Sequence, residues 1–238
     1  MDLKDIIIAS DESHHLYKRK PMYSQRFRKV LKFHPPGFAP VYDDTGTYHI
    51  RMDGTPAYRK RFIATFGFYY SLAAVITQNG WTHINPSGEY VYNERHSWVG
   101  NYQYGYCAIR DKKGYYFHID MQGSPLYSEK HLYAGDFRDG IAVVRLKNGL
   151  CTHIDPQGKI IHNKMFEDLD VYHKGFARAH ERNGWFHIDV NGNPVYTEKY
   201  LMVEPFYNGQ SLVHRYNGEV GVINEQGKWI HTVWIKEK

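Results

Sequence analysis

The chain has 238 residues, of which 42 % are hydrophobic and 16 % aromatic, and its formal net charge is +5. The hydrophobic share excludes a disordered chain, while 21 glycines and 10 prolines are typical of a protein with many tight turns. The 21 tyrosines favour strands, because aromatic side chains pack well on a pleated surface.

The amino-terminal residues and the two cysteines are those of a cytoplasmic protein. The apolar run 6–9 is far too short for a signal peptide or a membrane span. Cys107 and Cys151 fall at different positions of the repeat described below, so we expect no disulfide. The sequence has no Cys-x-x-Cys pair that would indicate zinc binding or thiol redox chemistry.

A basic segment lies between Ser13 and Tyr42, where the sequence has no Asp or Glu. Its basic residues are Lys18, Arg19, Lys20, Arg26, Arg28, Lys29 and Lys32. One interpretation is a solvated edge whose acidic partners come from neighbouring parts of the fold. The other is a docking surface for an acidic partner or a nucleic acid.

A repeat of 34 or 35 residues organises the whole chain. Its anchors are His14, His49, His83, His118, His153, His187 and, with substitution, Val222. Five residues later stand Arg19, Gly54, Gly88, Gly123, Gly158, Gly192 and Gly227. Nine residues after the anchor stand Tyr23, Tyr58, Tyr92, Tyr127, His162, Tyr196 and His231. No linker separates the copies, so we expect one domain over residues 1–238.

The upstream half of each copy predicts a strand with one buried face. Small and apolar residues alternate there, as in the pairs Ala39/Val41, Ala73/Val75, Cys107/Ile109, Ala142/Val144, Ala177/Ala179 and Ser211/Val213. This period of two is typical of a half-buried strand. An aromatic residue comes a few positions earlier in each copy, for example Phe68 or Phe206.

Two turns divide each unit. The first contains Asn-Gly or a similar pair, such as Asn79-Gly80 and Asn183-Gly184, and we expect a hairpin in which both residues take positive φ. The second turn, for example Asp155-Pro156-Gln157-Gly158, predicts a type I turn closed by a glycine bulge.

Each unit should therefore hold three strands, with a fourth supplied by the run that follows, and almost no helix. Three- or four-stranded units in tandem predict an all-β fold, a closed β-propeller of six or seven blades. An open β-solenoid is the alternative. We also expect the two termini to complete one blade together, with residues 6–9 supplying a strand.

The His-Ile-Asp triplet invites a metal-site hypothesis, since His187 and Asp189 lie on the same side of a strand. A residue that every unit repeats more often solves a problem of the unit itself. We therefore expect the histidine to bond a turn and the aspartate to cap it, with no metal and no cofactor.

Catalytic motifs are absent from the sequence. It contains no G-x-G, no P-loop, no G-x-S-x-G and no H-E-x-x-H. The carboxylate pairs Asp168/Asp170 and Asp136/Asp139 are interpreted as surface or turn residues. An enzyme with its site in a central channel stays an alternative that no residue pattern supports.

Departures from the repeat are the better candidates for binding, because the fold does not require them. The predicted binding residues are Lys18, Arg19, Lys20, Arg26, Arg28, Lys29, Trp98, Arg178, Arg182 and Arg215. Further departures are Ser71, His131, His162, His173, His180, Glu204 and Val222.

The unit resembles the bacterial WG-repeat family, whose Gly-Trp-like hairpins are met here as Gly80-Trp81 and Gly184-Trp185. Longer stretches, including 133–140 and 203–209, are similar to a repeat region that precedes a SAM-dependent methyltransferase domain in some bacterial proteins. The resemblance covers nearly the whole chain. It implies a non-catalytic repeat module that works with an enzyme.

The leading hypothesis is accordingly a binding or scaffolding module that presents a protein or other substrate, with an associated methyltransferase as a candidate partner. A multivalent carbohydrate-binding lectin is the alternative, because aromatic residues on a repeat scaffold could stack on sugars. Binding of a nucleic acid or acidic partner through the basic segment is the third. We expect no membrane partner.

Overall fold

The computed structural model describes residues 2–235 and is built from seven small antiparallel sheets, each made of consecutive strands. The prediction of an all-β chain of tandem three- and four-stranded units is confirmed. The only helix in the described residues is a three-residue 3₁₀ turn, Leu3–Asp5. Contacts group the chain into two compact units, Met1–Pro125 and Leu126–Lys238, and each is described by itself.

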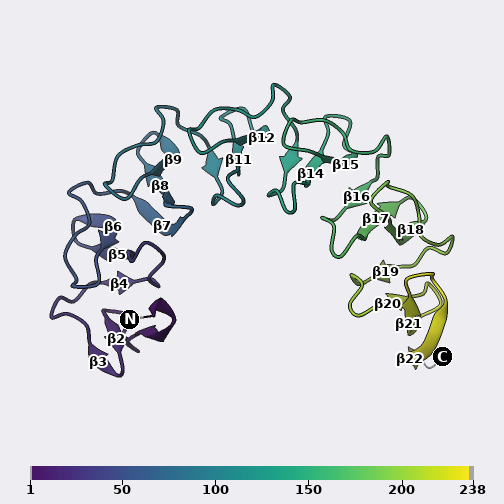
Figure 1. Cartoon of the computed structure of the whole chain (residues 1–238), viewed down its shortest axis with the longest axis horizontal. Helices are drawn as coiled ribbons and strands as arrows, with labels where there is room; N and C mark the ends of the chain where they lie inside the picture. The colour runs from purple at the N-terminus through teal and green to yellow at the C-terminus, as the bar shows by residue number, and fades with distance from the viewer. Residues whose placement is uncertain (1, 236–238) are drawn as a thin grey trace. The chain divides into compact units, whose positions relative to one another are not determined.

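The first unit holds four sheets of three strands each (Figure 1). Its strands are β1 (Ile6–Ile8), β2 (His15–Tyr17), β3 (Lys20–Pro21), β4 (Lys29–Val30), β5 (Ala39–Asp43), β6 (Gly46–Ile50), β7 (Ala64–Tyr69), β8 (Leu72–Thr77), β9 (Gly80–Ile84), β10 (Trp98–Val99), β11 (Cys107–Arg110) and β12 (Tyr116–Ile119). One cluster of buried apolar residues runs through the first three of these sheets, from Ile6 to Ile84.

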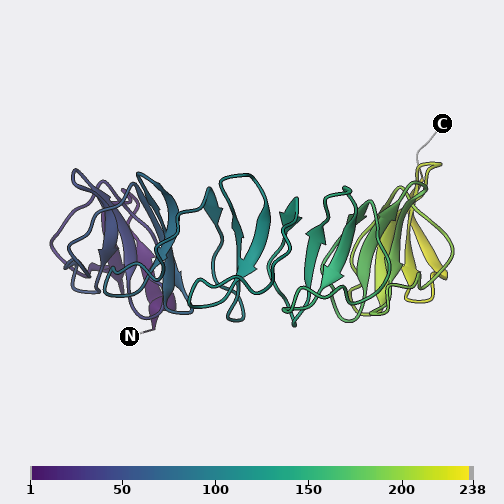
Figure 2. The same cartoon turned by 90° about the horizontal axis from the view of Figure 1, so that it is seen from above.

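The second unit holds two sheets of three strands and a last sheet of four. Its strands are β13 (Tyr133–Ala134), β14 (Ala142–Arg145), β15 (Cys151–Ile154), β16 (Asp168–Leu169), β17 (Ala177–Glu181), β18 (Gly184–Ile188), β19 (Met202–Val203), β20 (Gln210–His214), β21 (Glu219–Asn224) and β22 (Trp229–Ile235). Within each sheet the strands lie side by side, as Figure 2 also shows.

The middle strand of each unit buries the alternating residues that the sequence singled out. Ala73 and Val75 in β8 are fully buried, and so are Ala142 and Val144 in β14. The predicted strand after the second turn is formed in the first sheet, as β3, and in the last sheet, as β22. In other sheets single bridges take its place, such as Ile84 with Tyr90 and Ile188 with Pro194.

Each end of the chain builds its own sheet. Strand β1 pairs with β2, and β22 pairs with β21. Residues 6–8 supply a strand, as predicted. That the two termini complete one blade together stays a prediction. Closure of the seven sheets into a ring, and the single domain, stay predictions.

The turns were predicted at the right places. The second turn has its glycine at positive φ, as predicted, for example +76° at Gly88, whereas the Asn-Gly turn has a different backbone geometry. In the Asn-Gly turns only the glycine has positive φ, +123° at Gly80 and +121° at Gly184. Two-residue hairpin loops with both residues at positive φ occur at other places. Lys18-Arg19 joins β2 to β3. Five more lie between the first two strands of their sheets: Tyr70-Ser71, Tyr104-Gly105, Asp139-Gly140, Lys174-Gly175 and Asn208-Gly209. Type I′ turns of this kind match the right-handed twist of paired strands.

The glycine of the second turn connects one repeat to the next. A Cβ on Gly88, whose φ is +76°, would lie 2.5 Å from the ring of Tyr58 in the preceding copy. The same contact recurs between Gly54 and Tyr23, Gly123 and Tyr92, Gly158 and Tyr127, Gly192 and His162, and Gly227 and Tyr196. Glycine is therefore required both by the backbone and by the neighbouring ring.

Replacement of Gly88 by alanine measures this contact. We expect G88A to lower the free energy of unfolding in urea by about 1–3 kcal/mol more than the control G105A, because overpacking adds to backbone strain. Gly105 has a similar φ of +85° and no atom within 4 Å of a built Cβ. Equal losses in the two variants would show that the ring contact contributes nothing.

Candidate functional site

The repeated histidines form buried bridges between successive units. Four of these histidines lie under a tyrosine of the same repeat and contact a main-chain carbonyl of the next repeat. The Nδ1 to Oη distances are 2.5 Å for His15–Tyr23, 2.5 Å for His49–Tyr58, 2.7 Å for His83–Tyr92 and 2.6 Å for His187–Tyr196. The Nε2 to carbonyl distances are 2.8 Å to Leu31, 2.7 Å to Phe66, 2.9 Å to Gly100 and 2.8 Å to Glu204, in the same order.

These partners determine the form of the imidazole. A carbonyl oxygen can only accept, so Nε2 carries the proton and donates it. Nδ1 is then an acceptor, and the tyrosine O–H donates to it. Burial lowers the pKa of His49, His83, His153 and His187 to about 4, which keeps these rings neutral.

Two details of the sequence interpretation change. In the first repeat the bridge is made by His15 and not by His14, whose ring contacts Ser13 and Asp11 instead. The prediction that the histidine bonds a turn is wrong. Its two ring nitrogens are satisfied by a tyrosine and by a main-chain carbonyl of the next repeat. The capping role of the aspartate is confirmed: Asp189 Oδ1 accepts from Asn191 N and Asn193 N, both at 2.9 Å.

His162 replaces the tyrosine in one unit. Its Nε2 lies 2.9 Å from Nδ1 of His153, whose Nε2 donates to the Asp170 carbonyl at 2.8 Å. His162 must therefore donate from Nε2, which leaves its buried Nδ1 unprotonated and without a hydrogen-bond partner in the described structure. A search of residues 2–235 finds no group of three or more His, Cys, Asp or Glu that could hold a metal ion.

Several predicted binding residues form hydrogen bonds or ion pairs within the fold. Arg26 Nη1 donates to the carbonyls of Tyr23, Ser24 and Gln25. Arg28 pairs with Asp44, and Lys29 lies 3.3 Å from Glu12. Lys18, Arg19 and Lys20 are exposed at the hairpin between β2 and β3.

The candidates outside the basic segment are scattered. Trp98 is 37 % exposed and tilts against Tyr116. Arg182 is exposed in the turn between β17 and β18, and Arg215 pairs with Glu198 and Glu219. His180 lies 3.2 Å from Glu167, and His131 is buried against Tyr127. Only Arg178 and His173 are brought together, as lining residues of one small cavity.

A further candidate site was missed by sequence reasoning. It is a groove of about 500 Å³ within the first unit, here called the Arg95 groove, and ligand sites are typically about 300–1,000 Å³ in size. Its lining residues are Thr45, Arg61, Phe62, Ile63, Thr77, Gln78, Asn79, Tyr90 and Arg95. A signal was present: basic residues recur twelve positions after the anchors, as Arg26, Arg61, Arg95, Lys130 and Lys199.

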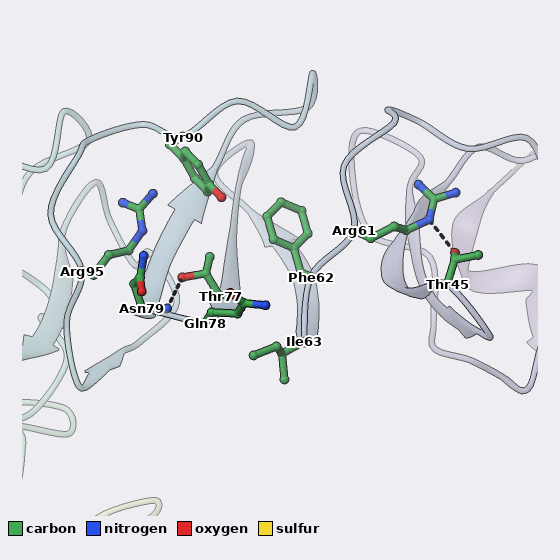
Figure 3. A pocket seen from close by; sticks show the side chains of 9 residues that line it. All are labelled: Thr45, Arg61, Phe62, Ile63, Thr77, Gln78, Asn79, Tyr90 and Arg95. Atoms are coloured by element: carbon green, nitrogen blue, oxygen red, sulfur yellow. Dashed lines mark hydrogen bonds between the residues drawn. The ribbon is translucent and has the colours of Figure 1, made fainter.

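Figure 3 shows how these side chains are distributed. Arg95 lies beside Tyr90, Thr77 and Asn79, while Arg61 lies beside Thr45 on the other side of Phe62 and Ile63. The Arg61 guanidinium is engaged at two of its nitrogens: Nε donates to Thr45 Oγ1 at 2.9 Å, and Nη1 donates to main-chain carbonyls of Tyr58, Arg59 and Lys60.

Arg95 keeps unused donors. Its Nη1 donates to the carbonyls of Tyr92, Asn93 and Glu94, as Arg61 does to those of Tyr58, Arg59 and Lys60. Its Nε and Nη2 make no hydrogen bond within residues 2–235, so three N–H groups are available to a ligand.

Arg95 also lacks the acidic neighbour that Arg61 and Lys199 have. Hydrogen bonds from Thr45 and Tyr48, aided by the charge of Arg61, outweigh burial and hold the pKa of Asp43 below its usual value. Lys199 forms an ion pair with Glu181. Asp43 and Glu181 each pair across the hairpin with the turn glycine. The residue at this position beside Arg95 is Thr77, which has no charge. The groove therefore carries an uncompensated positive charge at this end.

Fold and site together define a β-repeat protein with a cationic, partly apolar groove between neighbouring repeats of the part Met1–Pro125. No protein-family model matches the sequence, and no curated protein is similar to it. No helix within residues 2–235 is long and apolar enough to span a membrane.

Three solved structures resemble the chain at low sequence identity. BamB from Moraxella catarrhalis is 14 % identical over 98 % of this chain and 86 % of its own, with a TM-score of 0.49. The computationally designed Ika8 protein is 11 % identical over 96 % of this chain and 83 % of its own, also at 0.49. A eukaryotic initiation factor is 9 % identical over 95 % of this chain and 68 % of its own, at 0.54. The last likeness concerns the fold alone.

The buried neutral histidines make stability depend on pH. Their pKa is about 4 in the folded chain against 6.5 in the unfolded one, so between these values the unfolded chain binds more protons. The contribution of the neutral histidines to the free energy of unfolding is complete above pH 6.5 and is lost as the pH falls toward 4. We expect the free energy of unfolding to fall by up to about 5 kcal/mol per pH unit within this window. Urea titrations at pH 7, 6 and 5 measure it, and a constant value would contradict the bridges.

The His162→Tyr variant restores the residue that other units carry. A tyrosine O–H would donate to His153 Nδ1, and the orphan nitrogen of His162 would disappear. We expect H162Y to raise the free energy of unfolding by about 1 kcal/mol, and H162F, which cannot donate, to lower it. Thermal unfolding of the three proteins decides, and an H162Y no more stable than H162F would contradict the assigned bond.

Proposed function

We propose that this chain is a non-catalytic binding module that takes an acidic, partly apolar polypeptide segment in the Arg95 groove. The observation that carries the proposal is the uncompensated guanidinium of Arg95 beside exposed apolar surface. A carboxylate accepts well from the spare N–H groups of an arginine.

Apolar surface supports the polypeptide part of the proposal. Ile63 is 60 % exposed although it lies next to the buried Phe62. An apolar side chain of the ligand would cover Ile63, which stabilises the complex in proportion to the area removed from water. A segment such as Glu-Leu-Glu places an apolar side chain next to an acidic one and fits this combination.

A sugar fits the groove less well. Stacking on a sugar needs a free aromatic face, and Tyr90 is the exposed aromatic of the groove. Lys60 Nζ and Arg95 Cζ lie over its ring, at 4.4 and 4.1 Å from the centroid. These cations occupy the surface on which a sugar would stack and favour an anionic ligand instead.

Nucleic-acid binding has support only at the hairpin of Lys18, Arg19 and Lys20. Lys18 and Lys20 border an open depression with Met22, Met52 and Asp53. The neighbouring Arg28 and Lys29 are already paired with Asp44 and Glu12, which leaves few charges for phosphate contacts.

The partner itself is proposed from the resemblance to WG repeats. In that family a repeat region precedes a methyltransferase domain in some proteins, so a segment presented to a methyltransferase is a candidate occupant of the groove. The proposed chemistry of the ligand, acidic and partly apolar, does not depend on this partner.

The proposal is tested with a fluorescein-labelled peptide that contains Glu-Leu-Glu, and with the matching Gln-Leu-Gln peptide. Fluorescence anisotropy should show saturable binding of the acidic peptide, weakened by salt, and binding of the neutral peptide about tenfold weaker. A neutral oligosaccharide and single-stranded DNA serve as competitors. If the oligosaccharide or the DNA displaced the labelled peptide and unlabelled acidic peptide did not, the proposal would be overturned.

Variants T77D and I63D locate the site. Thr77 accepts from Asn79 N as Asp43 accepts from Thr45 N, so T77D preserves the turn and supplies the acid that neutralises Arg95. Both variants should weaken peptide binding at least about tenfold. The control is L201D, since Leu201 occupies the position of Ile63 in another unit and is 55 % exposed. Loss in L201D equal to that in T77D would contradict the assignment.

A further inference from the structure

A second cavity lies within the unit Leu126–Lys238 and has a volume of about 130 Å³. Its lining residues are Arg138, Asp170, Val171, His173, Phe176, Arg178, His187, Pro205, Phe206 and Tyr207. We propose that this cavity binds an oxyanion, a carboxylate or phosphate group, between Arg138, Arg178 and His173.

Arg178 stands where the repeat needs an apolar residue. It pairs directly across the sheet with the anchor His187. The residues that pair with the other anchor positions are Pro40, Ala74, Ala108, Val143 and Leu212. The fold itself therefore does not require a guanidinium at this position.

The Arg178 guanidinium is held in place but not exhausted. Its Nε donates to Asp170 Oδ2 at 2.5 Å, and Nη1 donates to the Val203 carbonyl at 3.0 Å. Nη2 has no hydrogen-bond partner within residues 2–235, and the Arg178 side chain is 28 % exposed. Two fixed contacts orient the remaining donors, which reduces the entropy lost when a ligand binds.

His173 supplies an unsatisfied ring nitrogen, which donates to an anion when it carries the proton. Its Nε2 is buried and has no partner in the described structure. Leaving such an atom unpaired costs about 1–3 kcal/mol, which a hydrogen bond to a bound anion would recover. The ring tilts against Tyr207, with centroids 5.1 Å apart, and so has a defined position at the cavity.

The charges favour an anion. Arg138 and Arg178 bring two guanidinium groups to the lining, and Asp170 is the one carboxylate among the lining residues. Asp170 is already bound to Arg178, so a positive charge remains even with His173 neutral. Arg138 is exposed, and its side chain makes no hydrogen bond or ion pair in residues 2–235.

Size restricts the ligand. A volume of about 130 Å³ corresponds to roughly four water molecules, at about 30 Å³ each. A carboxylate or phosphate group fits, whereas a whole nucleotide or peptide does not. The apolar wall of Val171, Phe176 and Phe206 excludes water behind the anion and strengthens its interaction with the arginines.

The test uses the full chain and isothermal titration calorimetry at low ionic strength, with inorganic phosphate and, separately, acetate. We expect one saturable site for at least one of the two anions, and the preferred anion identifies the group that the cavity takes. Wild-type protein that binds neither anion saturably would overturn the proposal.

Variants taken from the repeat itself locate the site without disturbing the fold. R178A/D170G carries residues found at the same positions in other units, Ala108 and Gly100. H173Q introduces the glutamine that another repeat has at the same position, Gln103, directly before the equivalent hairpin loop. Each should bind the anion at least about tenfold more weakly.

The control R182A removes one positive charge from an exposed turn and should bind as wild type does. T77D, in the other unit, should also retain anion binding, so failure of this proposal is distinguishable from failure of the peptide-binding proposal. Wild-type affinity in both R178A/D170G and H173Q would overturn the assignment.

Discussion

The buried, neutral histidine is the interaction on which the rest of the fold depends. One ring nitrogen accepts from a tyrosine of its own unit and the other donates to the main chain of the next. Such a ring can be fully buried because both nitrogens are satisfied, and an unpaired one would cost several times what the bond contributes. The turn glycine under the preceding tyrosine, as in Gly88 and Tyr58, completes the link between units.

Because histidine, tyrosine, glycine and aspartate of the motif are committed to the fold, binding chemistry is left to positions where units differ. Thr77 replaces an acid and leaves Arg95 uncompensated. Arg178 replaces an apolar residue and brings a charge to a small cavity. In both places a single substitution in an otherwise regular unit changes the local charge, while the surrounding strands keep their register.

Much of the fold could be predicted from the sequence, because the period of 34 or 35 residues and the alternation around Ala73 and Val75 are local signals. The hydrogen-bond partner of the histidine could not be predicted. The Phe66 carbonyl that accepts from His49 Nε2 is a main-chain group, and it has no sequence signature. The Arg95 groove was missed for a related reason. A recurring basic residue resembles an ordinary surface charge until the carbonyls that it caps and the missing acid are known.

The central claim is that the anchor histidines are neutral structural bridges, and nitrogen NMR of a histidine-labelled chain tests it most directly. For His15, His49, His83, His153 and His187 we predict a proton on Nε2 and an unprotonated Nδ1. For the last four we also predict no titration between pH 7 and 5. Resonances of these five rings that show the Nδ1–H tautomer, or that titrate near pH 6.5, would contradict the account.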